Sequence, residues 1–261
     1  MFSMSALASA NIDVTELARL GVLQGTSALL PVRTVLSLGW PELERALPDR
    51  GLPRGVVEIA ALPRLHGKAS TSFLPESMRG GATTIALAAM RSVHAADAQA
   101  WCVWITPAHP GMPFLYAPAL VRAGVDLDRL LVVRPSPQAL ARTVVKAAAS
   151  GAFSLLVVDA PHRNDLGGGR MKQGRSGEET DTVVVRKLAL SAEESGTTSL
   201  LLTSALTPRS VPWPVAMRLE VERRPDALSI RVTKDRRGGG ASAQVVRLFD
   251  PTESDALPRA V

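Results

Sequence analysis

The chemistry that the sequence suggests first is phosphate binding, at a glycine turn between an apolar strand and a helix. Residues 56–60 are typical of a buried strand, and residues 80–84 (Gly-Gly-Ala-Thr-Thr) open an alanine-rich helix. This order favours a phosphate-binding loop, because the free N–H groups of a helix N-terminus attract an anion. A second apolar strand, 154–159, ends in an acid that could hold hydrated Mg²⁺. The candidate nucleotide-site residues are Gly80, Gly81, Thr83, Thr84 and Asp159.

The lysine of this pattern has two competing positions. In the register that leads directly into the helix, the lysine position is occupied by Ala82. The other register contains the pair Gly67-Lys68, but Ala69 stands where a serine or threonine should bind Mg²⁺, and Pro75 interrupts a helix there. We favour the first register, in which the charge that stabilises a phosphoryl transition state is missing. It predicts either a weak, vestigial nucleotide site or a glycine turn that only packs the helix against the sheet.

Strands and helices alternate along most of the chain. Continuous apolar strands, each expected to be buried, occur at 56–60, 101–105, 130–133, 154–159 and 198–203, and helices are expected at 82–97, 115–123, 137–149 and 180–195. The alternation predicts an α/β fold with a mostly parallel sheet flanked by helices. Three more strands, 215–222, 227–234 and 242–249, follow without helices, and we expect them to be antiparallel additions at one edge. Within 227–234 apolar and polar residues alternate, which predicts one buried and one exposed face.

Composition narrows the class of protein. The net charge of +6 is compatible with nucleic-acid or acidic protein partners, and equally with a solvated excess of arginine. The single cysteine, Cys102, lies in a predicted buried strand, and one cysteine cannot form an internal disulfide, which fits a reducing cytoplasm. No stretch approaches the ~18 apolar residues of a membrane span, and no basic region of the kind that begins a signal peptide is present. We expect a cytoplasmic protein without a membrane partner.

The first 35 residues differ in pattern from the rest. Residues 13–16 have capping-box spacing, which predicts a short helix over about 13–23 followed by an extended arm. Apolar residues on an arm usually contact a partner, and folding back onto the chain's own core is the alternative. The predicted partner-arm residues are Leu17, Leu20, Leu23, Leu29, Leu30 and Val32. We therefore divide the chain into a helix and arm (1–35), a core (36–250) and a flexible tail (251–261).

Two basic loops are candidates for weak DNA contact. Residues 162–179 form a polar, glycine-containing stretch, and residues 234–240 form the tip of a predicted hairpin. Such loops can bind phosphates, although a charged loop is more commonly only solvated. Aromatic residues make up 4% of the chain, so base stacking is not expected. The candidate DNA-contact residues are Arg163, Arg170, Lys172, Arg175, Lys234, Arg236 and Arg237.

Several segments resemble RecA recombinases and follow the same order along the chain. They span about 36–249 and comprise 36–47 with 51–59, 123–131, 150–159, 186–189 and 231–236. The resemblance implies a RecA-like core, with the loop at 162–179 in the place of the first DNA-binding loop. It also implies that the N-terminal arm corresponds to the region through which RecA subunits pair. The second DNA-binding loop is short, since 205–214 contains three prolines, and the separate C-terminal domain of RecA is not expected.

The chain departs from RecA at the residues of the ATPase site. Ala82 stands where RecA has its phosphate-binding lysine, Ala108 where it has the catalytic glutamate, and Ser204 where it has the glutamine that senses the γ-phosphate. Three losses in one site imply a protein that is not an enzyme and that needs no cofactor. Weak binding of nucleotide or Mg²⁺ stays open.

A RecA-like core of this length with a degenerate site resembles the ImuA family. Its members accompany ImuB, a catalytically inactive polymerase-like protein, and an error-prone polymerase in damage-induced mutagenesis. The resemblance implies a cytoplasmic bacterial accessory protein of translesion synthesis in the SOS response, which binds RecA, ImuB or both and touches DNA weakly. Association with the nucleoid stays open. Two alternatives remain: a divergent ATPase in which Lys68 reaches the phosphate site, and a SulA-like division inhibitor that binds FtsZ.

Overall fold

The computed structural model describes residues 35–62, 81–108, 115–160, 177–206, 213–236 and 242–248, with the backbone alone for 177–180. The chain divides into two units, Met1–Thr34 and Val35–Val261. All of the described residues belong to the second unit. The predicted N-terminal helix, most of the arm and the tail at 251–261 lie outside the described residues.

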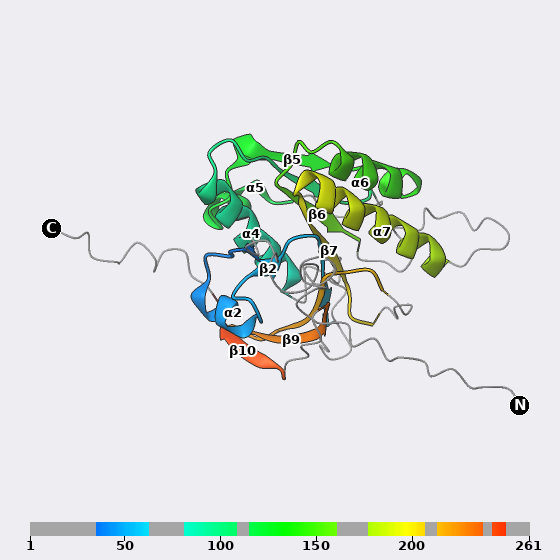
Figure 1. The fold of residues 1–261 in the computed structure, drawn as a ribbon. Coiled ribbons are helices and arrows are strands. Elements are labelled where there is room, and N and C mark those ends of the chain that lie inside the picture. The colour runs from blue at the N-terminus through cyan, green and yellow to red at the C-terminus, as the bar shows by residue number, and fades with distance from the viewer. Residues whose placement is uncertain are drawn as a thin grey trace, which may run out of the picture. The chain divides into compact units, whose positions relative to one another are not determined.

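An eight-stranded mixed sheet forms the centre of the second unit (Figure 1). Its strands are β3 (Val56–Ala61), β4 (Cys102–Ile105), β5 (Leu130–Val133), β6 (Leu155–Asp159), β7 (Thr198–Ser204), β8 (Met217–Arg223), β9 (Ala227–Asp235) and β10 (Gln244–Arg247). Their order across the sheet is β10-β9-β8-β3-β7-β6-β4-β5. The strands from β8 to β5 are parallel, whereas β9 and β10 add antiparallel pairs. The predicted α/β fold with a mostly parallel sheet is confirmed.

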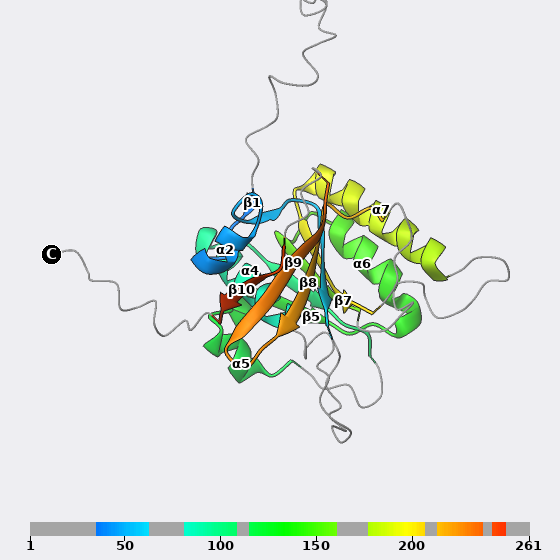
Figure 2. The same ribbon diagram turned by 90° about the horizontal axis from the view of Figure 1, so that it is seen from below.

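Helices cover both faces of this sheet (Figure 2). The helices are α2 (Pro41–Ala46), α4 (Ala82–Ala96), α5 (Ala117–Arg122), α6 (Leu140–Ala149) and α7 (Gly177–Ser195), with 3-10 turns η1 (Leu127–Arg129) and η2 (Pro137–Ala139). Side chains of α2, α4 and α5 share one hydrophobic core with one sheet face, and side chains of α6 and α7 share a second core with the other face. The short strands β1 (Val35–Leu36) and β2 (Leu52–Pro53) pair antiparallel in a separate ribbon. None of the described helices combines the length and the apolar character needed to cross a lipid bilayer.

Two expectations about the strands are wrong. The first of the three C-terminal strands, β8, pairs parallel with β3, from Val57 opposite Met217 to Ala61 opposite Val221. The strand at 130–133 is β5, which lies at the edge of the sheet and pairs with only one of the described strands, β4. Its central residues, Leu131 and Val132, are 45% and 41% exposed rather than buried.

The alternation predicted for β9 is confirmed. Leu228, Ile230 and Val232 are buried in the core below the sheet, whereas Arg231 and Thr233 are exposed on the opposite face. Because successive side chains of a strand point to opposite faces, this pattern shows that none of the described helices covers the outer face of β9. The sheet is therefore covered on both faces near β6 and β7 and on one face near β9.

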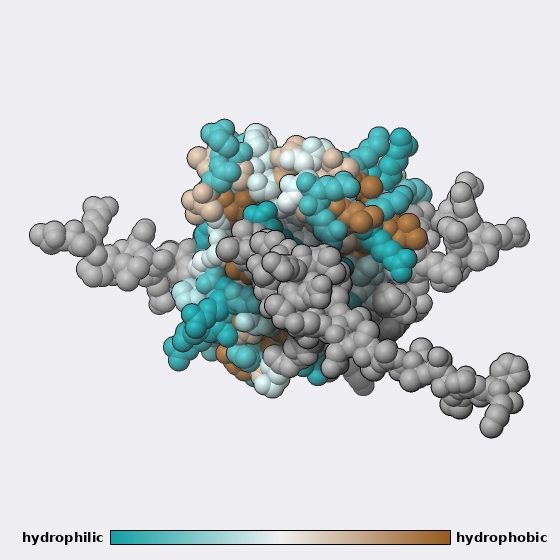
Figure 3. All heavy atoms as spheres, in the orientation of Figure 1, coloured by the Kyte–Doolittle hydropathy of each residue, from teal (hydrophilic) through white to brown (hydrophobic). Residues whose placement is uncertain are grey.

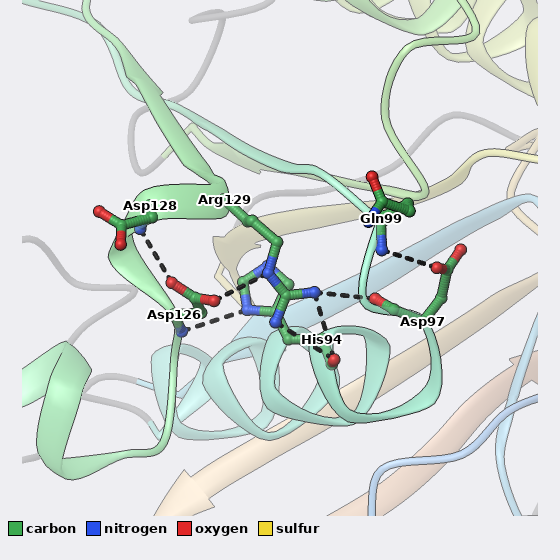
Figure 4. Close-up of polar contacts among 6 residues, drawn as sticks. All are labelled: His94, Asp97, Gln99, Asp126, Asp128 and Arg129. Atoms are coloured by element: carbon green, nitrogen blue, oxygen red, sulfur yellow. Dashed lines mark hydrogen bonds and ion pairs between the residues drawn. The ribbon is translucent and has the colours of Figure 1, made fainter.

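The C-terminal end of α4 is held by one arginine (Figure 4). The guanidinium of Arg129 donates hydrogen bonds to the carbonyl oxygens of His94 (3.3 Å) and Asp97 (2.8 Å) and to the carboxylate of Asp126 (2.8 Å). The backbone N–H of Asp126 in turn donates to His94 Nδ1 (3.2 Å). A cation here satisfies carbonyls that the helix leaves open and complements the helix dipole. The helix is thus fixed at the end opposite to the glycine turn.

Candidate functional site

The positions at which RecA carries its ATPase residues lie at the carboxyl ends of neighbouring parallel strands in this structure. Ser204 lies opposite Ala61 at the end of β3, and Asp159 lies opposite Leu202 of β7. Ala108 follows β4, the strand next to β6. Because parallel strands end at the same edge, the structure gathers these positions along the edge at which α4 begins.

The N-terminus of α4 is packed into the hydrophobic core. Gly81 has a φ of 87°, and a Cβ at this position would lie 2.5 Å from Leu228 Cδ2 and 3.5 Å from Val221 Cγ1. The left-handed conformation favours glycine here, and a Cβ would in addition require the Leu228 side chain to shift. The next residue, Ala82, is fully buried in the core that α4 shares with the sheet. Gly81 therefore faces apolar side chains of β8 and β9, which favours the packing interpretation of the glycine turn.

Polar side chains remain along this edge. Asp159 is buried at the end of β6. The hydroxyl groups of Thr83, at the start of α4, and of Thr106, just after β4, are buried and make no hydrogen bond to any described residue. Ser204 Oγ accepts a hydrogen bond from the N–H of Leu206 (3.3 Å). Hydroxyl groups and one carboxylate suit hydrated Mg²⁺, whereas none of these groups supplies the cation that phosphoryl transfer requires.

The structure gives no further support for a nucleotide site at the other predicted residues. Thr84 is half-buried in the first turn of α4, and its N–H donates to the carbonyl oxygen of Gly81 (3.1 Å). Gly80 and the competing Lys68 lie outside the described residues. Within the described ranges, no three His, Cys, Asp or Glu side chains gather into a group that could hold a metal ion.

Sequence reasoning missed a buried ion pair in the middle of β3. Glu58 is fully buried, and its carboxylate accepts hydrogen bonds from Thr203 Oγ1 (2.8 Å), Trp213 Nε1 (2.8 Å) and Arg218 Nη1 (3.0 Å). The ammonium of Lys234 donates to the carbonyl oxygen of Trp213. We call these five residues the Glu58 cluster.

The Glu58 cluster joins four adjacent strands on the sheet face that α7 covers. It also fixes the point at which the chain returns to β8, because Trp213 is held both by its indole and by its carbonyl group. A buried carboxylate is tolerated only when donors replace its hydration. We interpret the cluster as structural, since Glu58 lies in the middle of its strand and not at the carboxyl edge.

Two of the predicted DNA-contact residues are described. Lys234 is half-buried, and burial, reinforced by the charge of Arg236, lowers the pKa of its ammonium group. Arg236 is exposed and lies 3.8 Å from the carboxylate of Glu193 on α7. DNA contact stays a prediction for both. The other DNA-contact and arm candidates lie outside the described residues: Arg163, Arg170, Lys172, Arg175, Arg237, Leu17, Leu20, Leu23, Leu29, Leu30 and Val32.

Comparison with known proteins adds no relative. A scan against protein-family models gives no match, and a search of the curated proteins finds none that is similar. The functional argument therefore depends on the residues of the chain itself.

Proposed function

We propose that this chain is a non-catalytic, RecA-like accessory protein of the ImuA type, which acts by binding in DNA-damage-induced translesion synthesis. The observation that carries the non-catalytic part is the burial of Ala82 behind Gly81, against β8 and β9. The collinear resemblance of residues 36–249 to RecA carries the family.

The packing of the glycine turn is hard to combine with phosphate binding. A lysine at position 82 would place its stem in the core, and removing an ammonium group from water costs several kcal/mol. The net stability of a whole domain is only about 5–15 kcal/mol. The turn that an ATPase keeps open for a phosphate here contributes to the hydrophobic core.

The strand order supports the RecA-like interpretation. The positions that differ from RecA come from separate parts of the chain, at Ala82, Ala108 and Ser204, and the parallel strands before them end at one edge. Asp159 lies at the end of β6, between the strands that precede Ala108 and Ser204. Three of the positions that the resemblance assigns to one site, Ala108, Asp159 and Ser204, therefore lie at the ends of neighbouring strands along one edge of the sheet.

The edges of the sheet support a binding role. At β10, the N–H of Arg247 donates to the carboxylate of Glu42 on α2 (3.0 Å), so that α2 lies against this strand. At the other edge, Leu131 and Val132 of β5 are exposed. An apolar edge strand is a template for pairing with a strand of another chain. We propose that RecA, or a polymerase-like partner such as ImuB, docks on this edge and on the N-terminal arm.

A turnover assay tests the catalytic half of the proposal. The purified chain is incubated with ATP and Mg²⁺, with and without single-stranded DNA, beside a recombinase as positive control. We expect background hydrolysis in both conditions. Turnover comparable to the recombinase would defeat the proposal. Nucleotide binding that disappears in Lys68→Ala would instead support the divergent ATPase.

A capture experiment tests the partner half. The tagged chain is recovered from cells exposed to DNA damage, and purified RecA, ImuB and FtsZ are then tested singly for direct binding. We expect RecA or ImuB to bind, and to bind more weakly to a variant with Leu131→Lys and Val132→Lys, because charges on an edge strand oppose pairing. Binding of FtsZ alone would favour the division inhibitor.

A further inference from the structure

Helices α6 and α7 carry four exposed basic side chains that take part in none of the ion pairs of the described residues. They are Arg142 and Lys146 on α6 and Arg186 and Lys187 on α7. Helix α6 contains no acidic residue at all. Among the described side chains, no acid forms an ion pair with these four charges, although the sequence of α7 has acids at both of its ends.

These side chains belong to one continuous surface. In α6 the buried residues are Leu140, Val144 and Ala148, and at 100° per residue Arg142 and Lys146 lie on the opposite side. The same geometry puts Arg186 opposite to the buried stripe of α7 and Lys187 at the side of that stripe, where both are exposed. The two helices lie side by side on one sheet face (Figure 1). Their C-terminal ends are adjacent, since a Cβ on Gly151 would lie 3.7 Å from Ser195 Cβ.

Apolar residues lie among the charges. Val183 is 44% exposed and Leu190 is 59% exposed, two turns apart on the outer side of α7, with Arg186 and Lys187 between them. Figure 3 shows hydrophobic atoms interspersed with hydrophilic ones over this part of the molecule. We call the α6–α7 patch the set of Arg142, Lys146, Val183, Arg186, Lys187 and Leu190.

We infer that the α6–α7 patch is the docking surface for an acidic, amphipathic helical segment of a partner protein. Carboxylates of that segment pair with the four cations, and its apolar side chains pack on Val183 and Leu190. The inference rests on the proposed function, in that the chain acts by binding, and adds a docking surface separate from the edge strand β5.

The composition of the patch favours a protein over a nucleic acid. A phosphate backbone would use the cations but would leave Val183 and Leu190 facing a charged, hydrated strand. The patch contains no aromatic residue on which a base could stack. Acidic residues flank the two cations of α7 along the helix, Glu178, Glu179 and Asp181 before them and Glu193 and Glu194 after them, so the acids of the segment must lie over the middle of α7 and over α6.

Fluorescence anisotropy with purified protein tests the inference. The probe is a labelled synthetic helix of about 16 residues, with leucines at i, i+3 and i+7 spacing and glutamates between them. A second probe keeps the glutamates and replaces the leucines with serine. The patch variants are Arg186→Glu with Lys187→Glu, and Leu190→Ser. All three residues are exposed, so thermal unfolding of the variants should match the wild type.

Matched controls place the same changes on other described surfaces. Arg122→Glu with Arg247→Glu reverses two exposed charges on α5 and β10, and Val245→Ser removes an apolar side chain that is 60% exposed. These variants have the same net charge and the same loss of apolar surface as the patch variants. A general effect of charge on the peptide would therefore affect both sets equally.

The expected result is binding of the leucine probe that weakens at least about tenfold in the charge-reversed patch variant and several-fold in Leu190→Ser. The control variants should bind like the wild type, added salt should weaken binding, and the serine probe should bind less tightly.

Equal affinity in patch and control variants would overturn the inference. So would an oligo(dT) probe that binds more tightly than the peptide and is lost in the patch variant, since the surface would then serve a nucleic acid. Neither result depends on ATP turnover or on RecA and ImuB capture, so failure here is separable from failure of the proposed function.

Discussion

Replacing Ala82 with lysine restores the side chain that a phosphate-binding loop would carry. The structure predicts that this substitution destabilises the protein and does not create a nucleotide site. Ala82 is fully buried, and Gly81 before it lies so close to Leu228 that a Cβ would be 2.5 Å away. The lysine stem therefore meets occupied space, and its ammonium group loses hydration in an apolar core.

Two costs set the magnitude. Overpacking a well-filled core costs about 1–3 kcal/mol. An unpaired charge inside a protein costs several kcal/mol more, even after relaxation. We expect a loss of about 4 kcal/mol or more in the free energy of unfolding, which is a large share of the stability of an ordinary domain.

Urea unfolding followed by circular dichroism measures this loss. Ala95→Lys is the matched control, because Ala95 is exposed on the same helix, and it should change the free energy of unfolding by no more than about 0.5 kcal/mol. Binding of a fluorescent ATP analogue is measured on both variants and on the wild type. An Ala82→Lys protein that is as stable as the wild type and binds the analogue would refute the packing argument. It would show that the turn can open and that only the lysine is missing.

The remaining predictions concern buried groups. Glu58→Leu and Arg218→Met should each lower the free energy of unfolding in urea by about 3–5 kcal/mol, because each leaves a buried partner unpaired. The double variant should lose clearly less than the sum of the two single losses. Additive losses would contradict this. Burial, together with the charge of Arg129, lowers the pKa of His94 below its ordinary value, so the neutral form is favoured in the folded state. The contribution of neutral His94 to the free energy of unfolding is therefore fully present above about pH 6.5 and is lost as the pH falls below that value. The dependence of the free energy of unfolding on pH should be weaker in His94→Asn, which keeps an acceptor for the Asp126 N–H. An equal dependence in the two proteins would show that His94 is not responsible. Burial raises the pKa of Cys102 to about 12, so iodoacetamide should label it only in urea, as followed by mass spectrometry; labelling of the native protein would mean that β4 opens.

Much of the fold follows from local pattern. The continuous apolar run of β6 predicts a strand covered on both faces, and the alternation of β9 predicts a strand covered on one face. Both are found because burial acts on each side chain separately, so it leaves a period in the sequence. The ends of α4 are also predictable, since a glycine turn starts it and polar residues follow it.

The direction and the order of the strands leave no comparable pattern in the sequence. β8 alternates apolar and polar residues like an antiparallel strand, yet it pairs parallel with β3. The alternation arises because the core lies below β8 while its upper face carries the polar side chains of Arg218 and Glu220. For β5, four apolar residues in a row indicate a strand but not its place, which depends on how the helical connections cross the sheet.

The Glu58 cluster could not be predicted from the sequence, because its members are far apart in the chain. The hydrogen-bonding partners of Glu58 are 145, 155 and 160 residues away in the chain. The one local signal was an acid in the middle of an otherwise apolar strand, which requires buried donors. The sequence does not identify Thr203, Trp213 and Arg218 as those donors, because their proximity follows from the strand order.

The glycine turn before α4 lies apart from the two surfaces that we propose for partner binding. Gly81 contacts Leu228, so a ligand that widened the turn would displace β9 and the core that α2, α4 and the C-terminal strands share. β5 lies at the opposite end of the sheet from β10, and the α6–α7 patch covers the second core on the other face. A partner bound at either place therefore leaves the α4 turn untouched. It follows that variants at Gly81 or Ala82 that still fold should bind partners with the same affinity as the wild type. In a protein whose partner binding depends on ATP, altering that turn would change the affinity for the partner.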